Sequence, residues 1–176
     1  MVQGLLYSQR IVPDVYISCF QYKILNRLLN CNHNLYKWKK SDTPLCCYCD
    51  SIDTIQHHLF ECSVSEAFWK RVCAWLRSVM CIDFLYEFTE CEILFGYNIF
   101  ETKYSAVNHI QNIVILVGKW YLNKNRSDHQ YICFNQFLCI LKRKIDIYVK
   151  IYTSKIDLKR PNYELQIGLK TILKKF

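Results

Sequence analysis

The chain has 176 residues, of which 52% are hydrophobic and 15% aromatic, and its formal net charge is +8 at pH 7. This length suits one domain of about 100–200 residues, and the hydrophobic content excludes a disordered tail. Only 4 Gly and 3 Pro argue against a sandwich or barrel with many tight turns. The composition therefore favours a folded domain built from long elements.

Apolar residues recur with helical spacing in several segments of the chain. The expected helices are residues 14–30, 63–80, 105–124, 134–152 and a last short helix from Pro161 to Phe176. Asn30, Asn32 and Asn34 are expected to end the first helix, and Ser63 with Glu66 forms a capping-box pattern at the start of the second. Residues 41–62 show no period and can supply a short hairpin, and residues 81–104 are expected to be irregular.

The longest apolar stretch, residues 110–122, is expected to be a buried helix. Polar residues interrupt every window of 18 residues around it, whereas a membrane span needs about 20 mostly apolar residues. We therefore expect no membrane partner.

The 11 cysteines are the unusual feature of the composition. An odd number cannot all pair, and the first ten residues lack the charged-then-apolar pattern of a signal segment. Reduced thiols in an intracellular compartment are therefore expected.

The strongest chemical pattern is the segment LCCYCDSIDTIQHHLFEC, residues 45–62, which contains Cys46-x2-Cys49-x7-His57-x4-Cys62. Zinc prefers four nitrogen or sulfur ligands in a tetrahedron, and two cysteines two residues apart can hold one metal from a tight turn. Cys62 directly precedes a predicted helix, where the thiolate form is favoured. The spacing therefore predicts a closed, structural zinc site.

Two neighbouring residues leave the choice of ligands open. His58 could replace His57, and Cys47 could compete with Cys46, although only one residue would then separate it from Cys49. A disulfide or ordinary buried thiols are the other interpretation of the segment. The eight cysteines outside the pattern are expected to be reduced and mostly buried in the core: Cys19, Cys31, Cys47, Cys73, Cys81, Cys91, Cys133 and Cys139.

The positive charge is concentrated near the C-terminus, where residues 140–176 carry ten Lys/Arg against three Asp/Glu. Clustered basic residues attract anionic partners such as nucleic acid, and aromatic residues between lysines suit stacking on single-stranded bases. The candidate nucleic-acid contacts are Tyr36, Lys37, Trp38, Lys39, Lys40, Lys142, Arg143, Lys144 and Lys150. The alternatives are a solvated helix face for the lysines and a hydrophobic lid on the zinc loop for the two aromatic residues.

No recognisable catalytic motif occurs in the chain. It contains no Gly-rich phosphate loop, no GxSxG, no HExxH and no Asp-Asp pair of the kind that polymerases use to hold metal ions. We therefore expect neither an enzyme nor a small-molecule substrate, although a Cys–His pair formed in space is left open.

The order of features between residues 19 and 75 resembles the zinc-binding domain that follows the reverse transcriptase domain in LINE-type (non-LTR) retrotransposon polyproteins. The matching features are a helix from Lys23 to Leu29, the Cys-x2-Cys pair, the block from Asp53-Thr54 to Cys62, and a helix with Phe68-Trp69. ILFGY at 93–97 and IVILVGKWYLNK at 113–124 resemble the C-terminal extension of these polyproteins.

This resemblance implies zinc as cofactor and a role in binding RNA or DNA during target-primed reverse transcription, in the nucleus or between nucleus and cytoplasm. The reverse transcriptase domain of the same element is a further expected partner. The alternatives are a structural or protein-interaction domain that docks on a polymerase core, or a non-functional remnant of an element.

The sequence thus predicts a mainly α fold, with about five helices around one core and a small irregular zinc-knuckle insertion. We expect residues 1–80 to hold the first helix, the knuckle (45–62) and the following helix, and residues 81–176 to form a helical extension packed on them.

Overall fold

The computed structural model describes residues 12–81, 87–97, 105–127, 131–154 and 161–176. These residues are mostly helical and include no strand, which confirms the predicted mainly α fold. One isolated antiparallel bridge joins Leu45 and Ile52. The helices are α2 (Val15–Leu25), α3 (Asn32–Lys37), the π-helix η1 (His57–Glu61), α4 (Ser63–Met80), α5 (Glu90–Phe95), α6 (Ser105–Ser127), α7 (Phe134–Ser154) and α8 (Pro161–Leu173).

Five of these elements correspond to the predicted helices, and three short ones (α3, η1 and α5) were not expected. The first predicted helix is too long, because α2 ends at Leu25. Arg27 then adopts a positive φ of 58°, and the Asn34 amide donates to the carbonyls of Arg27 and Leu29 at 3.0 and 2.8 Å. These bonds close a turn between α2 and α3.

The predicted capping box at Ser63 and Glu66 is wrong. Cys62 is the N-cap of α4 and makes no side-chain cap bond, while Glu66 instead pairs with Lys70 at 2.7 Å. A capping box is present at α5, where the Thr89 hydroxyl accepts from the backbone N–H of Glu92 and the Glu92 carboxylate accepts from that of Thr89. This pair explains why part of the segment predicted to be irregular is helical.

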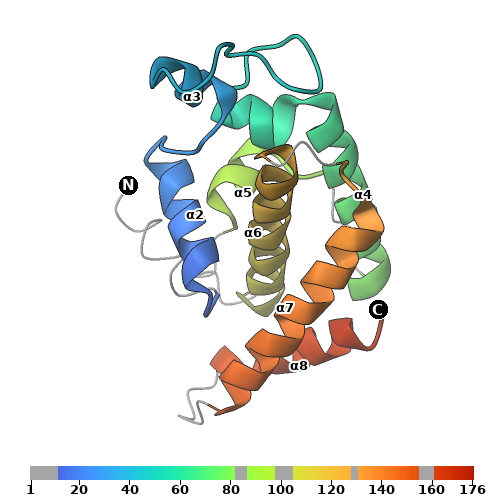
Figure 1. Ribbon diagram of the computed structural model, residues 1–176. Coiled ribbons are helices and arrows are strands. Elements are labelled where there is room, and N and C mark those ends of the chain that lie inside the picture. Colours follow the sequence, from blue (N-terminus) through green and yellow to red (C-terminus); the bar gives the residue numbers. More distant parts are fainter. Residues whose placement is uncertain (1–11, 82–86, 98–104, 128–130, 155–160) are drawn as a thin grey trace.

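Helix α6 runs through the middle of the fold, with α2 on one side and α7 crossing it on the other (Figure 1). It also contacts α8 and η1, so it links the zinc loop to the C-terminal helices. Its central residues are almost completely buried, as the apolar stretch predicted. No described helix is long and apolar enough to cross a membrane.

Buried hydrophobic residues form one large cluster and a second, smaller one. The large cluster joins α4, α6, α7 and α8, and the Phe68 ring contacts Trp69, Tyr121 and Phe137 at its centre. Trp69 is 3% exposed, so its indole is part of this core. The smaller cluster lies between α2, η1 and α5 and consists of Phe20, Ile24, Leu29, Leu59 and Leu94.

The prediction that the eight remaining cysteines are mostly buried is wrong. Only Cys31 and Cys73 are buried, whereas the other six are exposed. The apolar stripes of the helices are occupied by larger residues such as Phe137 and Leu141 on α7, which leaves Cys139 on the exposed side of that helix. All 11 cysteines lie in the described residues, and none of them forms a disulfide.

Candidate metal centre

The first two predicted ligands, Cys46 and Cys49, lie on the tight turn closed by the Leu45–Ile52 bridge. The backbone N–H of Cys46 donates to the carbonyl of Ser51 at 2.8 Å, and that of Tyr48 donates to the Cys46 sulfur at 3.4 Å. These bonds fix the turn and orient the Cys46 sulfur toward the cluster.

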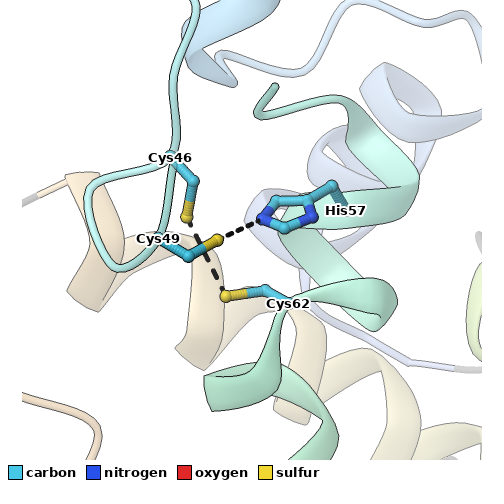
Figure 2. Close-up of side chains that lie close together, drawn as sticks. All are labelled: Cys46, Cys49, His57 and Cys62. Atoms are coloured by element: carbon cyan, nitrogen blue, oxygen red, sulfur yellow. Dashed lines mark hydrogen bonds between the residues drawn. The ribbon is translucent and has the colours of Figure 1, made fainter. Parts of the chain in front are cut away.

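The other two predicted ligands, His57 and Cys62, lie at the two ends of η1. The Thr54 hydroxyl accepts a hydrogen bond from the backbone N–H of His57 at 3.0 Å and so holds the start of this helix. The backbone N–H of Cys62 donates to the carbonyl of His57 at 3.0 Å, the i to i+5 bond of a π turn. Figure 2 shows the imidazole and the three sulfur atoms pointing toward one another.

The four donor atoms all lie within 4.8 Å of one another. The sulfur atoms of Cys46 and Cys62 are 3.9 Å apart, and the Cys49 sulfur is 3.2 Å from Nε2 of His57. Zinc–sulfur bonds of about 2.3 Å at the tetrahedral angle would place two sulfurs about 3.8 Å apart. The donor set and its spacing therefore fit a zinc ion, and four protein ligands leave no open position.

The cluster is only partly prepared to ionise. Burial raises the pKa of the Cys46 thiol to about 12, whereas a hydrogen bond from the backbone of Ser51 lowers the pKa of Cys49. Burial lowers the pKa of His57, and the positive charge of Arg126 lowers it further, so the neutral, metal-binding imidazole is favoured. A bound metal would therefore have to displace the proton of Cys46.

The structure separates the two alternative ligands from the cluster. His58 turns its Nδ1 toward both carboxylate oxygens of Asp53, at 3.2 Å each, and Cys47 is exposed. The structure thus brings together Cys46, Cys49 and Cys62 with His57, the set preferred from spacing.

Asp53 is a structural centre of the loop that the ligand spacing did not reveal. Its side chain is almost fully buried and accepts from the backbone N–H of Asn32 at 2.8 Å, from His58 and from Arg126 at 3.2 Å. Burial opposes its ionisation, but the hydrogen bond from His58 and the other donors together hold its pKa below the ordinary value. The Asp53-Thr54 pair was visible in the sequence, whereas nothing local pointed to Arg126.

The candidate nucleic-acid contacts fall on two separate elements. On and after α3, the side chains from Tyr36 to Lys40 are all exposed, with Tyr36 at 50% and Trp38 at 42%. On α7, Lys142, Arg143 and Lys150 are exposed. Lys144 is instead bonded to Asp14, and its ammonium lies 5.3 Å from the centre of the Trp120 ring. Their contact with nucleic acid stays a prediction.

A comparison with known protein families decides how the cluster is interpreted. Residues 3–69 match the family described as zinc-binding in reverse transcriptase. The matched segment contains all four residues of the cluster and ends at Trp69 in α4. The cluster is therefore suited to zinc in its donor set and lies within the segment that is similar to this family. No curated protein and no solved structure matches the chain.

Proposed function

We propose that the chain is the zinc-binding C-terminal module of a LINE-type (non-LTR) retrotransposon reverse transcriptase, and that it assists RNA or DNA binding during target-primed reverse transcription. The convergence of Cys46, Cys49, His57 and Cys62 inside the matched segment carries the proposal. The module supplies no catalytic group of its own, and its site of action would be nuclear or nucleocytoplasmic.

Zinc would act as a structural staple in this module. The segment from Leu45 to Thr54 contains one isolated bridge and no helix, so few regular backbone hydrogen bonds hold it without the metal. A structural zinc ion can contribute on the order of 10 kcal/mol to folding. With the metal bound, this segment would be fixed between α3 and the start of α4.

Metal analysis tests the zinc part of the proposal. Protein purified under reducing conditions should contain one equivalent of zinc, and Cys49→Ser or Cys62→Ser should lose it. Cys47→Ser, a change of the same kind beside the cluster, is the matched control and should retain the full equivalent. Protein that binds no zinc, or a control that loses as much as the ligand variants, would contradict the assignment.

The exposed aromatic and basic segment from Tyr36 to Lys40 would contact the nucleic acid. Lysines bind phosphates with release of counterions, so affinity should fall steeply with salt, and aromatic rings stack on bases for about 1–3 kcal/mol each. The exposed residues of α7 would add further phosphate contacts, with Lys144 contributing least because it is held by Asp14.

Binding of a fluorescent single-stranded RNA and of a DNA of the same sequence, measured at several salt concentrations, tests this part. Lys37→Gln should reduce the slope of log K against log salt by about 0.7, the value for one single-strand phosphate contact. Lys70→Gln removes an exposed lysine that is already paired with Glu66 and should leave the slope unchanged. Weak binding that does not depend on salt would refute the nucleic-acid role.

One observation favours the second candidate, a domain that docks on a polymerase core. Helix α2 exposes large apolar side chains, with Val15 at 73%, Tyr16 at 84% and Tyr22 at 47%. Capture of the module by the polymerase domain after nuclease treatment, and its loss in Tyr16→Ser, would favour this candidate. Capture that disappears with the nucleic acid would favour the first.

A further inference from the structure

Arg126, near the end of α6, reaches the metal cluster from outside the matched family segment. The residue is 3% exposed, and its Nη1 lies 3.7 Å from the Cys46 sulfur, 80 residues away in the chain. The same nitrogen donates to Asp53 at 3.2 Å, while Nη2 donates to the Ser65 hydroxyl at 3.3 Å. Arg126 therefore contacts the knuckle turn, the centre of the loop and the first turn of α4.

The flat face of the Arg126 guanidinium group also contacts an aromatic ring, that of Tyr48. Its central carbon lies 5.0 Å from the centre of the Tyr48 ring, and Tyr48 stands between Cys46 and Cys49 on the knuckle turn. A planar guanidinium can stack on an aromatic ring and donate in its own plane at the same time, which a lysine ammonium cannot do in this geometry. The position is thus suited to arginine.

The charges around this group change when a metal binds. Three thiolates, a neutral imidazole and a zinc ion carry a net charge of −1, whereas the same side chains without metal and with protonated thiols are neutral. Buried charge is unfavourable unless an opposite charge compensates it. Arg126 Nη1 contacts both the Cys46 sulfur and the Asp53 carboxylate, so without Arg126 these two groups would lose the positive charge that they share.

We propose that Arg126 is a positioning residue of the zinc site, which compensates the charge of the metal-bound Cys46 thiolate and holds the knuckle on α6. The inference rests on the proposed zinc binding. Arg126 makes α6 part of the metal centre, so zinc binding and the packing of α6 on the zinc loop stabilise each other.

Zinc affinity of the full chain, measured by competition with a chromophoric chelator at fixed pH, tests the inference. Arg126→Met should weaken zinc binding at least tenfold. Arg126→Lys keeps the positive charge but loses the two separate donor nitrogens of the guanidinium, so its zinc affinity should lie between those of Arg126→Met and the wild type. Lys124→Met removes an exposed positive charge from the same turn of α6 and is the matched control. It should bind zinc as the wild type does.

A double variant separates charge from packing. Replacing Asp53 by Asn in the Arg126→Met background removes the second negative group, and it should recover part of the lost affinity. The helical content of each variant, followed by circular dichroism, shows whether it is folded. If Arg126→Met does not fold, the comparison of Arg126→Lys with the wild type decides, and an unchanged affinity in that variant overturns the inference.

A second readout compares thermal unfolding with and without zinc. Arg126→Met should lose more stability in the zinc form than in the metal-free form. Equal losses in the two forms, or an unchanged zinc affinity in the folded variant, would show that Arg126 only packs, and would overturn the inference. A wild-type chain that binds no zinc would instead refute the proposed function itself.

Discussion

Gly118 of α6 lies directly against the indole ring of Trp69 of α4, where a Cβ atom would stand 2.8 Å from the ring carbon Cη2. Trp69 in turn donates its ring N–H to the carbonyl of Leu59 in η1 at 2.7 Å. The close approach of α6 to α4 therefore positions an indole that supports the helix between two cluster residues.

We expect Gly118→Ala to destabilise the protein for this reason. Alanine favours a helix over glycine by up to about 1 kcal/mol, but the clash with a rigid buried ring should cost about 1–3 kcal/mol. Gly168→Ala on α8 is the control, because its Cβ would meet the terminal methyl group of the Ile110 side chain and not a rigid ring. Urea unfolding should show a lower midpoint for Gly118→Ala than for Gly168→Ala, and the reverse order would contradict this packing.

The adjacent histidines should differ in their relation to zinc. His57→Gln should lose the bound metal, because Nε2 of His57 is the nitrogen in the cluster. His58→Gln should retain one equivalent but lose about 1–3 kcal/mol of stability, because Asp53 loses a buried hydrogen-bond partner. Metal content and denaturant unfolding of the two variants check this difference. Loss of zinc in His58→Gln with retention in His57→Gln would reverse the ligand assignment.

Lys119 should make stability depend on pH. It is fully buried between Gln21 and the carbonyl of Leu94, and burial lowers its pKa from 10.5 to about 7. Between these values the unfolded chain holds a proton that the folded chain has released, so stability should rise with pH, by at most about 1.4 kcal/mol per unit. As the pH falls toward 7 this gain is lost.

The measurement is the difference in unfolding free energy between wild type and Lys119→Met at pH 7, 8 and 9. This difference should increasingly favour the wild type as the pH rises. Lys124→Met, an exposed lysine on the same helix, serves as the control for general charge effects. A constant difference across this range would show that Lys119 keeps its proton in the folded state.

The thiols should react in two groups. In the folded, zinc-loaded protein, a maleimide should alkylate the six exposed cysteines quickly. These are Cys19, Cys47, Cys81, Cys91, Cys133 and Cys139. Cys31 and Cys73 should react slowly because they are buried, and the three cluster cysteines because they hold metal. Mass spectrometry of peptides over time gives the rates. Uniform reaction of all 11 thiols would contradict both the burial and the metal site.

The sequence predicted well what depends on periodic or local patterns. The apolar stripes located the five long helices, and the start of α4 at Ser63 was predicted correctly. The Thr89-x-x-Glu92 capping pattern was present but overlooked, while the similar Ser63-x-x-Glu66 pattern misled, because the N-cap position belongs to Cys62. A capping-box pattern therefore predicts a cap only where its first residue takes the N-cap position, which at α4 belongs to Cys62 and not to Ser63.

What the sequence could not predict depends on contacts between distant segments. Arg126 and Asp53 are 73 residues apart, and no local pattern indicates that they meet. The exposure of most cysteines was missed for a related reason, since a small apolar residue fits either face of a helix and larger neighbours decide which face is buried.

The π turn of η1 has a consequence for how this motif can vary. In an α turn, residues four apart share a face, and His58 with Cys62 would be the natural pair. The wider π turn contains one more residue, so His57, and not His58, lies on the same face as Cys62. The choice between two adjacent histidines is thus made by the winding of a single turn. Deleting one residue between His57 and Cys62 would leave them four apart, the spacing of an α turn, and we expect this shorter motif to keep the same four donors.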